Sequence, residues 1–460
     1  MLCKEERTML KRKLYDDLLV WKNERSKDKA LFLMGARQVG KSTLAREFGK
    51  KNFEQVIEVN FLETPLAQKF FKNADPAQIL TSLTAWSKKT IIPGQTLIIL
   101  DEIQECPHAR TAIKFLVQEG SCCYIETGSL LGIQYKPVQS YPVGFEEQMN
   151  MYPLDFEEFL WAMDFPEESI RQIQKNYRQK SPVLEGIHEL LLRYFNTYIV
   201  VGGMPEVVSE YVKTKDITRV KTRQKAILDL YRNDISKFVS GLMSLKVRQI
   251  FDSIPSQLDD KSRRFRMNAI GKRRQFRDLE DSFLWLEEAG IALPCYNTAA
   301  PVTPLRMNEK RNLFKLFMND TGLLCAASLG EDIQIQLLMG NLQINSGSIL
   351  ENAFAQALKS KGLDLYYFDS KKIGELDFVV QNGSTVDVLE IKSGADYTKH
   401  AALDRALQVQ DWPFRQKIVF CKSNVFEEDG ILYLPYYMIL FYAQKEEKKL
   451  IWDPLQPNFN

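Results

Sequence analysis

Gly35-Ala-Arg-Gln-Val-Gly-Lys41-Ser42-Thr43 is the stretch that decides the fold of the first part of this 460-residue chain. It matches the pattern GxxxxGK[ST], follows the apolar run from Ala30 to Met34 and opens a helical stretch. The glycines let backbone N–H groups curl around phosphates, and the helix N-terminus adds partial positive charge. We therefore predict that nine residues form a nucleotide-phosphate loop: Gly35, Ala36, Arg37, Gln38, Val39, Gly40, Lys41, Ser42 and Thr43.

Two side chains of this loop have defined expected roles. Lys41 is expected to reach the β- and γ-phosphates, and Ser42 is expected to supply a magnesium ligand. Arg37 and Gln38 either touch the nucleotide or face solvent. The predicted cofactors are therefore ATP and Mg²⁺.

An acidic pair at the end of a buried strand supplies the second half of such a site. In TLIILDEIQ (96–104), Asp101 is expected to hold the magnesium ion, mostly through water. Glu102 is expected to orient and activate the attacking water, which distinguishes a hydrolysing ATPase from a simple nucleotide binder. The next strand ends in Thr127 and Ser129, and either could sense the γ-phosphate or form a plain turn.

The surrounding segment alternates strand-like and helical runs, which predicts a parallel sheet covered by helices. We assign residues 1–190 to a P-loop parallel-sheet ATPase domain of α/β class. The expected strands are 30–34, 55–61, 96–100 and 122–126, and the expected helical stretches are 41–50, 65–88 and 111–119.

Long amphipathic helices follow Met151, with the turn VGGMP (201–205) between them. One helical face in residues 278–291 followed by a Pro-containing segment predicts a winged helix, so we assign residues 191–335 to a helical and winged-helix domain. Residues 261–277 contain no acid and are expected either to contact the DNA backbone or to lie solvated at the surface. The cations of this basic segment are Lys261, Arg263, Arg264, Arg266, Lys272, Arg273, Arg274 and Arg277.

The last part of the chain, residues 336–460, again mixes helices and strands. GELDFVV and TVDVLEIKSG flank Asn382-Gly383, a pair that favours a two-residue hairpin turn. If Gln381 pairs with Ser384, Asp377 and Glu390 are diagonal neighbours on one face, about 7 to 8 Å apart, and can share a metal ion.

Lys392 points to the same face as these two carboxylates, and Glu351 on the helix 349–361 is the upstream glutamate. An Asp, an ExK and an upstream Glu are the parts of a magnesium-dependent phosphodiesterase, in which the lysine positions or deprotonates water. The alternative is an edge hairpin that carries charges on its solvated face.

Composition adds few constraints. The formal net charge is +2, and seven cysteines without CxxC spacing are expected to be reduced core thiols. Three histidines leave almost no material for a zinc site. The charged N-terminus is not a secretory signal and no apolar run is long enough to span a membrane, so we expect a cytoplasmic protein without membrane contact.

Several motifs together resemble a large prokaryotic group of AAA-type ATPases. These are GARQVGKST, LIILDEIQ, ETGSLLG, MYPLDFEEFLWA, VGGMPEVV, FKLFMNDTGLL and GELDFVV followed by VLEIKSG. The resemblance implies a C-terminal α/β domain similar to the PD-(D/E)XK restriction-endonuclease fold, with Glu351, Asp377, Glu390 and Lys392 at its motif positions. It also implies a winged helix before that domain. Many members carry a Gly-Arg pair before the PLxFEEF segment, but residues 142–147 contain no arginine.

The leading hypothesis is an ATP-hydrolysing protein that engages DNA through its middle segment and cuts or clasps it with the nuclease-like domain. The alternative is a regulatory ATPase switch whose nuclease-like domain is a non-cleaving binding module. A small-molecule kinase is disfavoured because Asp101-Glu102 suits water activation and no Arg-rich lid is evident. Assembly into a homo-oligomer stays open.

Overall fold

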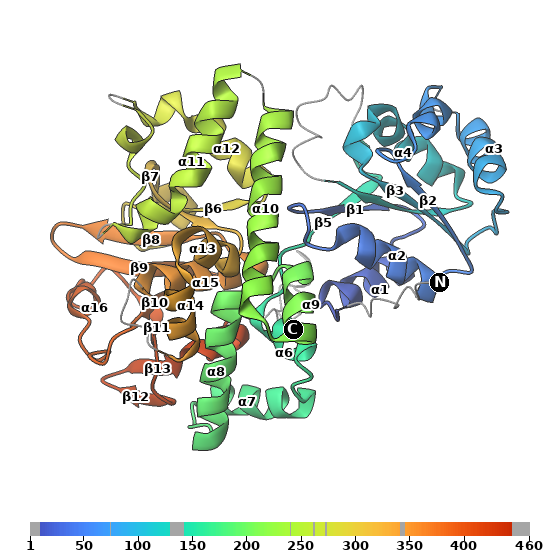
Figure 1. The fold of residues 1–460 in the computed structure, drawn as a ribbon. Helices are drawn as coiled ribbons and strands as arrows, with labels where there is room; N and C mark the ends of the chain where they lie inside the picture. The colour runs from blue at the N-terminus through green and yellow to red at the C-terminus, as the bar shows by residue number, and fades with distance from the viewer. Residues whose placement is uncertain are drawn as a thin grey trace, which may run out of the picture.

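A parallel five-stranded sheet forms the core of the first part of the chain (Figure 1). The computed structural model describes residues 10–73, 75–128, 142–239, 241–260, 263–271, 274–340 and 346–443. The strand order is β2-β3-β4-β1-β5, and β1 and β3 are buried along their whole length, as expected for a parallel sheet covered on both faces. The strands are β1 (Ala30–Met34), β2 (Gln55–Asn60), β3 (Thr96–Asp101), β4 (Cys123–Thr127) and β5 (Glu146–Asn150).

Helices cover both faces of this sheet. Side chains of α1 and α2 pack on one face, and side chains of α3 and α4 pack on the other. This layering follows from the strands, whose alternate apolar residues point to opposite faces. The elements are α1 (Leu14–Glu24), α2 (Lys41–Asn52), α3 (Pro76–Ser87), α4 (Pro107–Glu119) and the 3₁₀ turns η1 (Pro65–Phe71) and η2 (Ile103–Glu105).

The predicted strands and helices of this part are confirmed within a few residues. In the sheet, β4 lies between β1 and β3. The sequence reasoning missed β5, because its polar sequence EEQMN lacks the apolar run of a central strand. This strand lies at the edge of the sheet, and its neighbour in the strand order is β1.

A helical region follows β5 and packs against the later part of the chain. The boundary expected near residue 190 falls within α8, which continues through that position without a break. α6 already packs with α8 and α9, so the change of architecture comes soon after β5. The helices are α6 (Phe156–Ala162), α7 (Glu167–Gln179), α8 (Glu185–Val201), α9 (Pro205–Thr214), α10 (Ile217–Phe238) and α11 (Gly241–Asp259).

The VGGMP turn between α8 and α9 packs closely against Leu154 and Asp320. A Cβ atom at Gly203 would lie 2.0 Å from the Leu154 carbonyl oxygen, and one at Gly202 would lie 2.2 Å from the Asp320 carboxylate. Asp320 accepts a 2.6 Å hydrogen bond from the Gly203 N–H and also caps the helix that begins at Thr321. Burial raises the pKa of Asp320 to about 6. The two glycines are therefore required by close backbone approach.

An eight-stranded mixed sheet organises the rest of the molecule, in the order β12-β13-β11-β10-β9-β8-β6-β7. α15 packs on one face and α16 on the other. The strands are β6 (Ala292–Thr298), β7 (Glu309–Met318), β8 (Tyr366–Ser370), β9 (Gly374–Asn382), β10 (Thr385–Ile391), β11 (Phe414–Cys421), β12 (Phe426–Glu428) and β13 (Ile431–Pro435). The helical elements are α12 (Glu280–Glu288), α13 (Thr321–Ser328), α14 (Glu331–Leu338), α15 (Ser346–Ser360), α16 (Ala401–Leu407), η3 (Met267–Ala269), η4 (Phe276–Asp278), η5 (Leu305–Asn308) and η6 (Tyr436–Phe441).

The expected two-stranded wing is part of this larger sheet. β6 and β7 form an antiparallel pair, but β6 also pairs in parallel with β8 through Tyr296 and Asn297. The division expected at residue 335 therefore crosses a continuous sheet. The winged-helix prediction did not include the pairing of β6 with β8, because local sequence does not specify which distant strand a hairpin joins.

The predicted register of the β9–β10 hairpin is wrong by two residues, because Gln381 pairs with Val386 and not with Ser384. Asn382 pairs with Thr385, so Gly383 and Ser384 form the loop and Gly383 takes the positive φ of +60°. Continued along the strands, this register places Asp377 directly opposite Glu390 instead of diagonally. The Cα atoms of directly opposite residues lie closer together than those of diagonal neighbours.

Candidate ATP site and C-terminal acidic centre

The phosphate loop lies at the carboxyl end of β1 and leads into α2. Gly35 has φ +143° and passes so close to Met151 that a Cβ atom would lie 2.2 Å from its carbonyl oxygen, and Gly40 has φ +98°. Lys41 Nζ donates to the carbonyl oxygens of Gly35 and Ala36 at 2.8 Å each. Burial lowers the pKa of Lys41 to about 8. The ammonium group is thus held within the loop, at the place where phosphate oxygens would provide negative charge.

Asp101 joins three polar side chains at the same edge of the sheet. Ser42 Oγ donates to Asp101 Oδ1 at 2.7 Å, and Asn60 Nδ2 donates to Oδ2 at 3.0 Å. The Thr127 hydroxyl also donates to Asp101 Oδ1. Ser42 and Asp101 are oxygen donors on adjacent elements, so they fit a magnesium ion bridged to nucleotide phosphates.

Glu102 lies directly after β3 with a left-handed backbone, at φ +54°. Its carboxylate accepts a hydrogen bond from Gln104 Nε2. Thr127, one of the two possible γ-phosphate sensors, lines the same cavity, whereas Ser129 lies outside the described residues. Glu102 lines the cavity beside the phosphate loop.

A cavity of about 1140 Å³ opens over the phosphate loop. Its volume is sufficient for a nucleotide. Beyond the loop, its walls come from the segment before α1, from α6 and from α9, so the helical region closes one side. Residues of these walls include Leu10, Arg12, Met151, Trp161, Pro205 and Val212.

Arg12 is a buried residue of this site that the sequence reasoning missed. Its Nη1 donates to the carbonyl oxygen of Val39 in the phosphate loop at 2.9 Å, and its Nη2 donates to the Tyr152 carbonyl at 2.6 Å. Its Nε donates to Glu158 Oε1 at 3.1 Å. Arg12 therefore ties the loop to the MYPLDFEEF segment. An arginine in a charged N-terminal stretch carries no sequence signal for this role.

We expect Arg12→Ala to lower the free energy of unfolding by about 3 kcal/mol, because it removes the buried arginine partner of Glu158. Chemical denaturation would measure the change. The matched control is Lys11→Ala, whose exposed ion pair with Glu167 contributes less than about 1 kcal/mol. Equal losses in the two variants would contradict the role assigned to Arg12.

The phosphate loop also contacts the helical region. Arg37 Nη1 lies 2.7 Å from Asp234 Oδ1 on α10, so this side chain forms an ion pair while lining the cavity. The Tyr231 hydroxyl donates to the Arg37 carbonyl oxygen at 3.2 Å. Gly290 packs against the loop, since a Cβ atom there would lie 3.2 Å from the Ala36 nitrogen. A movement of the phosphate loop would therefore change its contacts with α10 and with the end of α12.

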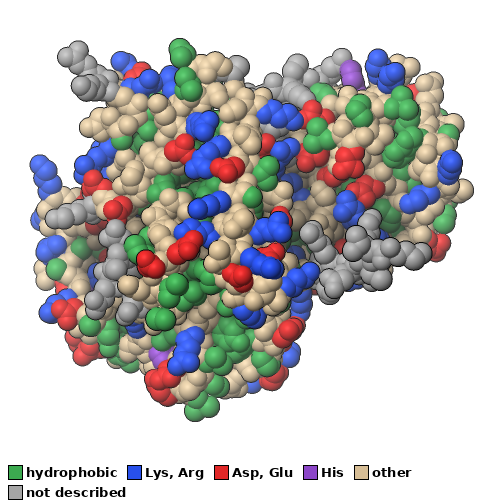
Figure 2. Space-filling model, in the orientation of Figure 1, with side chains coloured by type: hydrophobic (Ala, Val, Ile, Leu, Met, Phe, Trp, Pro, Cys, Tyr) green, Lys and Arg blue, Asp and Glu red, His purple; other side chains and the backbone are tan. Residues whose placement is uncertain are grey.

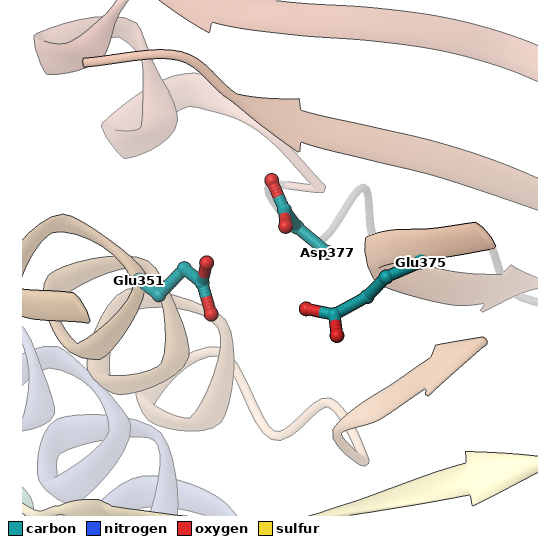
Figure 3. Close-up of side chains that lie close together, drawn as sticks. All are labelled: Glu351, Glu375 and Asp377. Carbon is teal, nitrogen blue, oxygen red and sulfur yellow. The ribbon is translucent and has the colours of Figure 1, made fainter. Parts of the chain in front are cut away.

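A second cluster of carboxylates lies in the eight-stranded sheet. Figure 3 shows Glu351 from α15 and Glu375 and Asp377 from β9 turned toward a common space. One oxygen of each lies within 4.8 Å of the others. Glu375 was missed because it lies in GELDFVV, two residues before the aspartate on which the sequence reasoning concentrated.

Glu390 and Lys392 adjoin this cluster. Lys392 Nζ lies 3.1 Å from Glu390 Oε2. Burial, and then the nearby Asp377 carboxylate, raise the pKa of Glu390 to about 8. Burial opposes the charge of Lys392, but the carboxylates of Glu390 and Asp377 raise its pKa overall. Burial and the neighbouring carboxylate therefore disfavour the charged form of Glu390 in this arrangement.

Two cations already occupy the carboxylates that a metal ion would need. Lys315 Nζ donates to Glu351 Oε2 at 3.0 Å and to Glu375 Oε1 at 2.6 Å. Arg263 forms an ion pair with the other oxygen of Glu351. The predicted residues are thus brought together, but the site in this arrangement does not fit a divalent cation.

Comparison with protein families places the first of these sites in a known class. Residues 27–160 match a family model described as an AAA domain. The chain therefore carries an AAA-type P-loop ATPase domain. Residues 192–334 and 346–439 match two further models, each described as a domain of unknown function, DUF8612 and DUF4143. No curated protein matches the sequence.

Solved structures with a similar fold include a Walker-type ATPase of Pyrococcus abyssi, at 15% identity and TM-score 0.41, over 69% of this chain and 96% of that one. The Aeropyrum pernix Orc1 protein in complex with DNA has 12% identity and TM-score 0.28, over 70% and 91%. A Thermotoga maritima RuvB branch migration motor has 14% identity and TM-score 0.29, over 62% and 89%. These scores are too low to carry an argument about function.

Proposed function

We propose that this protein is an ATP-hydrolysing switch that uses Mg²⁺ and engages DNA through the basic segment 261–277. The observation that supports hydrolysis is the meeting of Lys41, Ser42, Asp101 and Glu102 at one end of the cavity. Lys41 and Ser42 would hold phosphate and magnesium, and Glu102 would activate water. In this proposal the nucleotide site acts on the remainder of the chain, which matches two separate family models.

The contacts between the phosphate loop and α10 support a switch. Arg37 and Tyr231 join these elements, and Tyr231 Oη also accepts a 3.3 Å hydrogen bond from Asn319 Nδ2 at the end of β7. Met318 beside it exchanges two hydrogen bonds with Asn352 on α15, the neighbour of Glu351. These contacts form a continuous connection from the phosphate loop to the acidic centre, along which loss of the γ-phosphate could be transmitted.

The nuclease-like module is proposed to be non-cleaving in the arrangement described here. Glu351, Asp377, Glu390 and Lys392 are all present, and the element order α15, β8, β9, β10, α16, β11 supports the restriction-endonuclease-like comparison. However, Lys315 and Arg263 already pair with Glu351 in this centre. This observation favours the regulatory ATPase with a binding module over an active nuclease.

DNA engagement is supported by exposed cations without acidic partners. On the face in Figure 2, basic and acidic side chains alternate along the strip where α10 lies in Figure 1, and α10 pairs include Arg223 with Glu206. In the basic segment, by contrast, Arg264 and Arg277 are exposed and form no ion pair with any residue that the structure describes. Arg263 turns inward instead, Arg266 pairs with Asp260, and Lys261, Lys272 and Arg273 lie outside the described residues.

We expect the double variant Arg264→Ala, Arg277→Ala to bind duplex DNA more weakly. The salt dependence of log K should become shallower by about 0.9 for each lost phosphate contact. Fluorescence anisotropy at several salt concentrations measures both. Arg266→Ala, in the same segment but already paired with Asp260, should change the slope much less. If the double variant leaves the salt dependence of log K unchanged, the basic segment is a solvated surface and not a DNA contact.

A further inference from the structure

Lys315 is a fully buried lysine in the middle of the acidic centre. It comes from β7, and its ammonium group contacts Glu351 and Glu375 at hydrogen-bond distance. These are two of the three carboxylates whose oxygens converge in Figure 3. The lysine therefore occupies two of the three carboxylates that a divalent cation at this centre would require.

A second cation reinforces this arrangement. Arg263, about a quarter exposed, pairs with the remaining oxygen of Glu351, and its backbone is left-handed at φ +47°. The Phe265 N–H donates to the Phe314 carbonyl oxygen at 2.8 Å, next to Lys315. The loop that carries Arg263 and the strand that carries Lys315 are therefore joined, and the two cations reach the centre together.

The centre already contains three cations without any bound ion. Lys315 and Arg263 pair with Glu351, Lys315 also pairs with Glu375, and Lys392 pairs with Glu390. A divalent cation entering this buried space would stand next to an ammonium group of the same sign, in surroundings that screen charge poorly. Metal binding would therefore require Lys315 to leave.

The cations and the carboxylates come from different segments of the chain. Arg263 and Lys315 lie within residues 192–334, whereas the carboxylates lie within 346–439, and these ranges match separate family models. The contact is thus made by one segment on the functional groups of the next. That is the form of an internal inhibitory contact.

We propose that Lys315, assisted by Arg263, is an internal counter-cation that keeps divalent metal ions out of the Glu351, Glu375 and Asp377 centre. Withdrawal of β7 or of the Arg263 loop would open the centre. The inference deepens the proposed function by supplying the regulation of the nuclease-like module. Its test uses neither ATP turnover nor DNA, so failure of the inference and failure of the proposed function are distinguishable.

The test is binding of Mn²⁺ to the full-length, nucleotide-free protein, followed by the electron paramagnetic resonance signal of free Mn²⁺. The variants are Lys315→Met, of similar length without the charge, and Lys310→Met, a control on the same strand outside the centre. We expect Lys315→Met to bind one Mn²⁺ per chain at least about tenfold more tightly than the wild type or the control. Adding Asp377→Asn to Lys315→Met should abolish the gain.

Thermal unfolding provides a second readout. Lys315→Met leaves buried carboxylates uncompensated, so Mn²⁺ should raise its Tm while leaving that of the wild type unchanged. Equal Mn²⁺ affinity in wild type and Lys315→Met, or no binding by the folded variant, would overturn the proposal. If Lys315→Met does not fold, Mn²⁺ binding to Arg263→Gln is measured instead. Tighter Mn²⁺ binding by Arg263→Gln than by the wild type supports the inference, and unchanged binding overturns it.

Discussion

Lys41→Ala is expected to reduce ATP hydrolysis by at least about 100-fold, the loss typical of removing one preorganised charge-stabilising group. In the structure, Lys41 Nζ is held by the carbonyl oxygens of Gly35 and Ala36, inside the loop that would surround the phosphates. Without the ammonium group, charge on the γ-phosphate in the transition state has lost its nearest cation in the loop. Phosphate release under saturating MgATP measures the effect.

The fold should survive this substitution. Burial lowers the pKa of Lys41, which means that the charged side chain is costly to keep in this position. Its removal therefore does not take away a net stabilising ion pair, and the circular dichroism spectrum should not change. The matched control is Lys50→Ala on the same helix, an exposed lysine 3.2 Å from Glu47. Wild-type turnover in a folded Lys41→Ala protein would refute the ATPase assignment.

Glu102→Gln is expected to lower turnover by about 10² to 10⁴, because the amide cannot accept a proton from the attacking water. ATP binding should persist, since Lys41, Ser42 and Asp101 remain in place. Loss of turnover with retained binding of a fluorescent ATP analogue separates the role of Glu102 from that of the phosphate loop.

The control for this prediction is Glu119→Gln, an exposed carboxylate at the end of α4. It has the same chemistry but lies at the opposite end of the helix that follows the acidic pair. If Glu102→Gln hydrolyses ATP as fast as this control, another group activates the water. Reduced binding together with reduced turnover would instead assign Glu102 a structural role in its left-handed turn.

The ATP site could be predicted because its parts are local in sequence. The glycines, Lys41 and Ser42 are neighbours, and Asp101 lies at the end of an apolar run that could only be a buried strand. Parallel strands bring their carboxyl ends to one edge of a sheet, so the meeting of Ser42 with Asp101 follows from topology. The role of Arg12 could not be predicted in the same way, because its partner Glu158 is 146 residues away in the sequence.

In the β9–β10 hairpin, the turn preference of Asn382-Gly383 led to the wrong register. Asn-Gly is a strong turn signal, but here Gly383 and Ser384 form the loop. The partner of each residue changes by two positions, so both registers keep the same side chains on the same faces of the sheet, and the apolar alternation of β9 and β10 could not distinguish them. The shift moved Asp377 opposite Glu390, which strengthened the cluster that we had expected on other grounds.

The sequence by itself determined the phosphate loop, the acidic pair and the residue types of the C-terminal centre, because these depend on short-range patterns. Only the tertiary structure decided that β6 and β7 extend the C-terminal sheet and that Lys315 enters among the carboxylates. A lone lysine in a strand has no local signal for its partner. Its position results from the packing of two distant segments, and that packing determines whether the centre carries a metal ion or an internal cation.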